Sequence, residues 1–189
     1  GPANVYFISA GKVAVHTAWQ YSLKLSLLLS VLGVVTGSVL LWRNSEQWFP
    51  GVPQELLWFA LSIFPITLLL GFVSSIFQGL QQFRAFNLIL LAQPVFTLII
   101  ITALVITGIS NLIWLLVAHL AGLVMTLLAS IYLLQPYLRK AEDSNKVNHN
   151  YGALVLNYGY KAHLSNILAF VNYKADIFLI NFFHVELTN

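Results

Sequence analysis

Residues 85–138 read AFNLILLAQPVFTLIIITALVITGISNLIWLLVAHLAGLVMTLLASIYLLQPYL and contain no Asp, Glu, Lys or Arg. The stretch is too long for one membrane-spanning helix, which needs roughly 20 predominantly apolar residues. Its only strong turn signal is GISN at residues 108–111. The sequence therefore predicts two spans here, over about 86–107 and 112–134.

Two further uncharged runs precede this stretch. Residues 25–42 and 56–83 lack the same four residue types and predict spans over about 19–42 and 56–78. A last apolar segment predicts a span over 162–183. An outer-membrane β-barrel would instead show short segments of alternating hydrophobicity. We therefore expect an all-α transmembrane bundle with about five spans.

The composition supports a polytopic membrane protein. Of the 189 residues, 59% are hydrophobic and 8% are charged, whereas a soluble domain carries about 25% charged residues. The net charge of +3 forms no basic face with interleaved aromatic residues, so we expect no nucleic-acid partner. The chain has no cysteine, which excludes disulfides and thiolate metal sites.

Polar segments indicate the internal boundaries. Residues 44–53 contain Pro50, Gly51 and Pro53, and residues 139–150 are polar and charged, which makes the second segment the expected main boundary. The chain begins GPANVYF, without methionine or a signal peptide. We therefore expect a fragment of a longer protein.

The cations outside the spans are unevenly distributed between the two sets of loops. One set holds Lys12, Arg84, Arg139, Lys140, Lys146 and Lys161. The opposite set holds only Arg43. By the positive-inside rule, we expect the N-terminal segment and the loops at 79–85 and 135–161 in the cytoplasm.

The last predicted span carries two charges near its middle. Within YKAHLSNILAFVNYKADIFLINFF, residues 160–183, Lys174 and Asp176 would lie where an ionisable group costs several kcal/mol unless it is paired or hydrated. Helix geometry separates these two residues by about 200°, so they cannot simply neutralise each other. We expect a polar cavity or partners on other helices, or, for Asp176, a structural hydrogen bond. An arc of roughly 120° contains the candidate cavity residues Asn166, Asn172, Tyr173 and Asp176.

One charged residue lies inside the first predicted span. Lys24 stands roughly one to two turns into it, beside Tyr21 and Ser22. It can either snorkel to the cytoplasmic interface or line a polar cavity, and the sequence favours neither. His119 is alone in an apolar span, where an imidazole more often serves helix packing than metal binding.

Pairs of small residues predict close contacts between helices. Gly33 and Gly37 are four residues apart, and Ala118 and Gly122 repeat the spacing. Small residues at this spacing let two helix backbones approach each other.

Signatures of soluble enzymes are absent from the sequence. It contains no Gly-rich phosphate loop, HExxH pair or GxSxG elbow, and no clustered carboxylates that could hold a metal. We therefore expect no catalytic residues, no metal and no cofactor. A membrane glycosyltransferase or acyltransferase is disfavoured because the outer loops are short and plain.

The segment YGYKAHLSNILAFVNYKADIFLINFF at 158–183 resembles the start of the second half of polysaccharide (O-antigen type) flippases. These belong to the multidrug/oligosaccharidyl-lipid/polysaccharide (MOP) exporter superfamily. In that family a helix bears a basic residue, often arginine, two positions before an aspartate, as Lys174 and Asp176 do here. GPANVYFISAGK and FQGLQQFRAFN resemble segments of the first half.

The resemblance implies a two-lobe, MATE-like transporter. Residues 1–138 would form part of the N-terminal transmembrane lobe, and 162–189 the first helix of the C-terminal lobe. Residues 139–161 would be the cytoplasmic linker between the lobes.

The implied function is flipping of a polyprenyl-pyrophosphate-linked oligosaccharide to the outer leaflet of the bacterial plasma (inner) membrane. The product would serve surface polysaccharide biosynthesis: O-antigen of lipopolysaccharide, capsule or exopolysaccharide. Lys24 and Lys174 would meet the pyrophosphate, and Asp176 would orient a cation or couple transport to H⁺ or Na⁺. The implied partners are membrane lipids and a glycan polymerase complex. The alternatives are a multidrug exporter of the same superfamily and a non-transporting scaffold of a glycan-assembly complex.

Overall fold

The computed structural model describes residues 1–109, 111–142, 151–162, 164–165 and 168–169, with only the backbone described over 140–142. The regular secondary structure of these residues is helical and includes no strand, which confirms the expected all-α class. The chain divides into two compact units, one ending at Asn148 and the other beginning at His149. In the second unit, residues 151–162 are helical.

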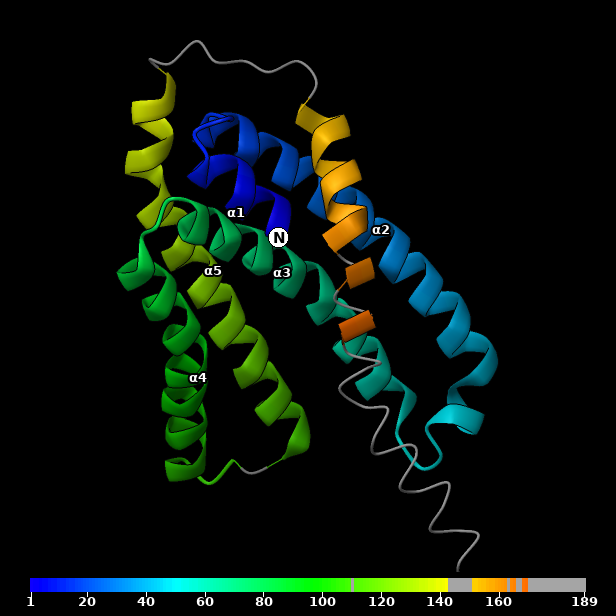
Figure 1. Cartoon of the computed structure of the whole chain (residues 1–189). Coiled ribbons are helices and arrows are strands. Elements are labelled where there is room, and N and C mark those ends of the chain that lie inside the picture. The colour runs from blue at the N-terminus through cyan, green and yellow to red at the C-terminus, as the bar shows by residue number, and fades with distance from the viewer. Residues whose placement is uncertain (110, 143–150, 163, 166–167, 170–189) are drawn as a thin grey trace, which may run out of the picture. The chain divides into compact units, whose positions relative to one another are not determined.

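The described part of the first unit contains five helices (Figure 1). They are α1 (Pro2–Ser9), α2 (Val15–Trp48), α3 (Gln54–Gly79), α4 (Phe83–Ile106) and α5 (Leu112–Glu142). All except α1 are long and apolar enough to cross a membrane, and they coincide with four of the predicted spans. The fifth predicted span, 162–183, lies largely outside the described residues.

Two of the helices extend beyond the predicted spans. The helix α2 continues past residue 42 to Trp48, and α5 continues past residue 134 to Glu142. A helix satisfies its own backbone hydrogen bonds in water as well as in lipid, so it need not end where the apolar run ends. The predicted linker 139–161 thus begins inside α5 and ends inside the helical residues 151–162. Its role between two lobes stays a prediction.

The four long helices pack as two hairpins. The pairs α2–α3 and α4–α5 make the most extensive contacts, and α3 and α5 also pack against each other (Figure 1). Each of these two central helices contacts the other three long helices. The core is therefore formed largely by side chains of α3 and α5. Its fully buried members include Val73, Ile76, Phe77, Ala118, Thr126, Ser130 and Leu134.

Small residues allow α2 to approach α3 closely. A Cβ atom added at Gly33 would collide with the ring of Phe64, and one added at Gly37 would lie 2.6 Å from Cδ1 of Leu61. Both glycines therefore make room for large side chains of α3. This confirms the prediction drawn from their spacing.

A small residue also allows α4 to approach α5 closely. A Cβ atom added at Gly122 would lie 3.0 Å from the backbone nitrogen of Thr97 and 3.3 Å from the carbonyl oxygen of Gln93. Ala118, one turn earlier, is fully buried. The predicted small pair therefore lies at a helix contact. The hydroxyl of Thr97 is buried here, and it has no hydrogen-bond partner in the part of the chain that the structure describes.

Three helices end in the same hydrogen-bonded turn, the Schellman motif. The residue after the C-cap is Gly11 in α1, Gln81 in α3 and Gly108 in α4, with φ of 63°, 58° and 80°. In α3 the amide of Gln82 donates to the carbonyl of Phe77 at 3.0 Å, which closes the motif. The turn at Gly108 lies where the sequence predicts the break between two spans.

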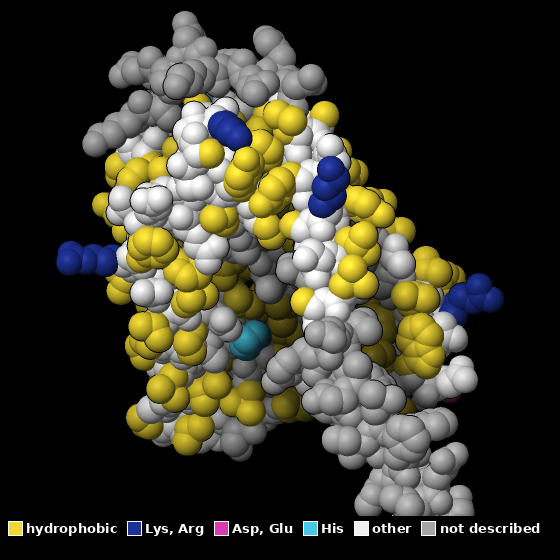
Figure 2. Space-filling view, viewed as in Figure 1, with side chains coloured by type: hydrophobic (Ala, Val, Ile, Leu, Met, Phe, Trp, Pro, Cys, Tyr) yellow, Lys and Arg dark blue, Asp and Glu magenta, His cyan; other side chains and the backbone are white. Residues whose placement is uncertain are grey.

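Apolar side chains are spread over all of the described surface seen in Figure 2, whereas cations stand singly. Leu27, Leu98 and Leu128, on three different helices, are each more than 60% exposed. Soluble monomers rarely expose contiguous apolar patches of this extent. The outward faces of these helices are therefore suited to contact with lipid.

Candidate functional site

Successive long helices run in opposite directions, and this gathers cations at one end of the first unit. Lys12 precedes α2, Arg84 opens α4, and Arg139 lies in the last turns of α5, so all three lie where α2 and α4 begin and α3 and α5 end. We call this the basic end. Arg43 lies toward the opposite end, near the C-terminus of α2. This separation fits the predicted orientation, in which the basic end faces the cytoplasm.

Lys24 is the predicted site residue whose surroundings the structure describes. It is exposed on α2, and its Nζ atom lies 5.8 Å from the centroid of the Tyr21 ring, within the range of a cation–π interaction. Arg43 follows Lys24 by 19 residues, a rise of about 28 Å, which is close to the hydrocarbon thickness of about 30 Å. The helix can thus place the two cations at opposite interfaces. This geometry favours an interfacial position for Lys24.

The other predicted cavity residues lie outside the described residues. They are Asn166, Asn172, Tyr173, Lys174 and Asp176. The polar arc that they form on a helical wheel stays a prediction.

A buried polar cluster joins α1, α2 and α3 at the basic end. The side-chain amide of Asn4 donates to the hydroxyl of Ser22 at 2.8 Å and to that of Ser75 at 3.1 Å. Ser75 in turn donates to the carbonyl of Phe72 at 2.7 Å. Asn4, Ser22 and Ser75 are each less than 5% exposed. The cluster holds α1 against the two longer helices, and sequence reasoning did not identify it.

A stripe of serines extends from this cluster along α2. Ser22, Ser26 and Ser30 are spaced by four residues and are all buried, following Ala18 on the same face. Lys24 lies about 200° from Ser22 around the helix and so belongs to the opposite face. The spacing of four residues was the sequence signal that could have revealed this stripe.

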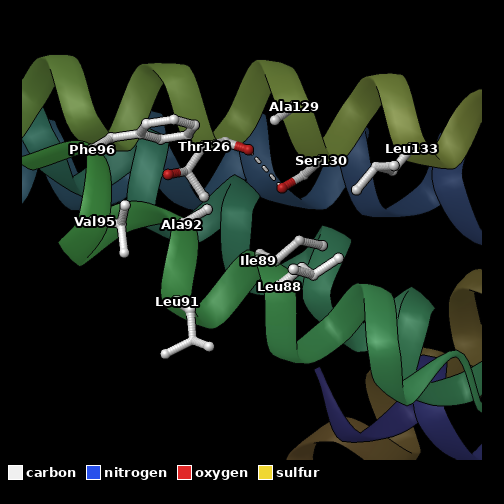
Figure 3. A pocket seen from close by; sticks show the side chains of 10 residues that line it. All are labelled: Leu88, Ile89, Leu91, Ala92, Val95, Phe96, Thr126, Ala129, Ser130 and Leu133. Atoms are coloured by element: carbon white, nitrogen blue, oxygen red, sulfur yellow. Dashed lines mark hydrogen bonds between the residues drawn. The ribbon is translucent and has the colours of Figure 1, made fainter.

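An apolar groove of about 290 Å³ lies between α4 and α5 (Figure 3). The residues that line it are Leu88, Ile89, Leu91, Ala92, Val95, Phe96, Thr126, Ala129, Ser130 and Leu133. Its two hydroxyl groups donate to carbonyls of their own helix, Thr126 to Gly122 at 2.8 Å and Ser130 to Thr126 at 2.6 Å. The hydroxyls that line the groove therefore already donate hydrogen bonds, and the rest of its lining is apolar.

His119 is half-buried on α5. Among the described residues, no group of three or more His, Cys, Asp or Glu side chains could hold a metal ion. The polar groups that the structure gathers in the described helices are therefore the buried cluster of Asn4, Ser22 and Ser75 and the cations of the basic end.

Comparison with known proteins found no matching family model, no similar curated protein and no similar solved structure. The resemblance to polysaccharide flippases therefore remains an expectation from the sequence segments quoted above.

Proposed function

We propose that this chain is part of a membrane transporter that flips a polyprenyl-pyrophosphate-linked oligosaccharide across a bacterial plasma membrane. The structural observation that supports the proposal is the exposure of Lys24 on α2, 19 residues before Arg43. With the basic end in the cytoplasm, as we propose, Lys24 would lie near the headgroups of the cytoplasmic leaflet. A pyrophosphate held in that leaflet lies at the same depth.

The physical problem is to move a polar glycan and its anionic pyrophosphate through about 30 Å of hydrocarbon. This requires a hydrated cavity for the headgroup while the polyprenyl tail stays in lipid. In the proposed mechanism, Lys24 makes the first contact with the pyrophosphate, and Lys174 receives it deeper in the membrane. Asp176 orients a cation or couples the movement to H⁺ or Na⁺, and two lobes rock to give alternating access.

The proposal is tested by complementation. The intact parent protein is expressed in a bacterium that lacks its own lipid-linked oligosaccharide flippase, and surface glycan and membrane abundance are both measured. We expect the wild type to restore surface glycan. We expect Lys174→Ala and Asp176→Ala to abolish the rescue at normal abundance, and Lys24→Ala to reduce it.

The matched control is Arg43→Ala, which removes a cation from the same helix as Lys24 but at the opposite end. This variant should rescue like the wild type. An abundant wild type that restores no glycan would favour a different substrate or a scaffold role. Loss of the Lys174→Ala and Asp176→Ala proteins from the membrane would assign those residues to structure.

A further inference from the structure

The α4–α5 groove offers an apolar ligand a surface that needs no polar partner. The hydroxyls of Thr126 and Ser130 are fully buried in its floor and already donate to carbonyls of α5. The remaining lining atoms belong to aliphatic side chains and to Phe96 (Figure 3). A polar ligand would lose its hydration here without gaining hydrogen bonds. A hydrocarbon chain incurs no such cost.

The groove is open toward the surroundings of the helices. Leu88, Leu91 and Val95 on its α4 side are 61%, 62% and 48% exposed, whereas Ile89 in the floor is 3% exposed. In a membrane these exposed side chains face lipid, so an occupant can enter the groove sideways from the bilayer.

One end of the groove is marked by a positive charge. Arg84 is exposed, and it lies on the same stripe of α4 as Leu88, Leu91 and Val95, which follow it by four, seven and eleven residues. The first turn of α4 contains no acidic residue, and Arg139 lies at the same end of the unit. Anionic groups are therefore attracted to this end of the groove.

The groove and the helical turn that precedes it together match one leaflet. The lining residues Leu88 to Val95 rise about 10 Å, and from Arg84 to Val95 the helix rises about 16 Å, roughly half of the 30 Å hydrocarbon thickness. A chain lying in the groove thus runs from the interface at the basic end to the middle of the bilayer. Phe96 lies at the inner end, which suits a chain that stops within one leaflet.

We propose that this groove binds one acyl chain of an anionic phospholipid, whose phosphate lies against Arg84. The charge complementarity at Arg84 and the single-leaflet length both favour this occupant. The proposal concerns the lipid-facing side of α4 and α5 and is independent of any transport activity.

The test uses the purified protein in nanodiscs and two photoactivatable probes, phosphatidylglycerol and phosphatidylcholine, each with a diazirine on its acyl chain. Labelled peptides are identified by mass spectrometry. We expect phosphatidylglycerol to label the groove residues of α4 and α5 in excess of the exposed faces of α2 and α3. Arg84→Gln should lower this labelling about fivefold, equivalent to about 1 kcal/mol for one cation at the membrane surface. Labelling by phosphatidylcholine should be unchanged.

Two matched controls separate the groove from general effects. Arg43→Gln removes a cation from the opposite end and should leave the labelling unchanged. Ala92→Phe fills the groove and should abolish the labelling. Its control is Ala103→Phe, which adds the same ring to an exposed position of α4 beyond the groove and should leave the labelling unchanged. Arg84→Gln alters only an exposed side chain, so it remains informative if Ala92→Phe fails to fold.

Three results would overturn the proposal. The first is labelling spread over all helices in proportion to their exposed surface. The second is equal labelling of wild type and Arg84→Gln by phosphatidylglycerol. The third is displacement of the probe by polyprenyl phosphate but not by unlabelled phosphatidylglycerol, which would assign the groove to an isoprenoid tail.

Discussion

Gln81 adopts a backbone conformation that suits its side chain poorly. It ends α3 with φ of 58°, in the position that glycine occupies at the ends of α1 and α4. A residue with a Cβ atom in this left-handed region costs roughly 1–2 kcal/mol. The Schellman hydrogen bonds hold Gln81 there because the turn from α3 to α4 contains only residues 80–82.

Replacing Gln81 with glycine should therefore stabilise the protein. We expect Gln81→Gly to raise the free energy of unfolding by about 1 kcal/mol, measured by SDS titration in detergent micelles. The control is Gln82→Gly. Gln82 has φ of −84°, so glycine there adds freedom to the unfolded chain without relieving any strain. Equal effects of the two substitutions would contradict the explanation.

Removal of the Asn4 side chain should destabilise the basic end. Its amide makes two buried hydrogen bonds to hydroxyls of other helices. Such bonds in membrane proteins are worth about 0.6 kcal/mol on average and up to about 1.7. We expect Asn4→Ala to lower the free energy of unfolding by about 1–2 kcal/mol. Asn44→Ala should change it little, because the Asn44 amide only donates to Leu40 of its own helix, at 3.4 Å.

Individual contacts of this kind were not predictable from the sequence. Asn4 and Ser75 are 71 positions apart, and such a pair leaves no periodic signal in the chain. The predicted site residues were chosen instead because charge is rare in apolar segments. Of these, Lys24 is exposed on α2, whereas Lys174 and Asp176 lie outside the described residues.

The contact between α4 and α5 leaves no room for a side chain at Gly122. An added methyl group would collide with the hydroxyl of Thr97 and would also crowd the backbone nitrogen of Thr97 and the carbonyl of Gln93, which cannot move without shifting α4. The groove described above lies along the same helix pair. Substitution at Gly122 is therefore a sensitive probe of this pair.

We expect Gly122→Ala to lower the free energy of unfolding by about 1–3 kcal/mol through overpacking. Gly71→Ala is the matched control, because Gly71 also lies within a long helix but has no atom within 4 Å of an added Cβ. That substitution should instead be stabilising by about 0.5–1 kcal/mol. Both values can be measured by SDS titration. Destabilisation of similar size at both positions would show that close approach is not the cause.

The four long helices could be predicted from the sequence, but their ends could not. The length of an uncharged run is set by the thickness of the hydrocarbon layer, so these runs locate each span within a few residues. The ends of α2 and α5 depend instead on helix propensity in water and on breakers such as Pro50. The short helix α1 was missed because its 8 residues are too few for a periodic pattern.

At the scale of the whole molecule, the basic end predicts how the chain is oriented. The absence of cysteine from the sequence makes single-cysteine labelling possible without background. In intact cells, a membrane-impermeant thiol reagent should label Gln47→Cys, beyond Arg43 on α2. It should label Lys12→Cys only after permeabilisation. The reverse pattern would place the basic end outside and would remove the basis for the role proposed for Lys24.

The docking of α1 has a consequence for how the protein is made. Asn4 and Ile8 pack against Ser75 and Gly79 at the far end of α3, so the partners of α1 leave the ribosome long after α1 itself. Until then the amide of Asn4 lacks its bond to Ser75. The basic end can therefore close only after both α2 and α3 have been made.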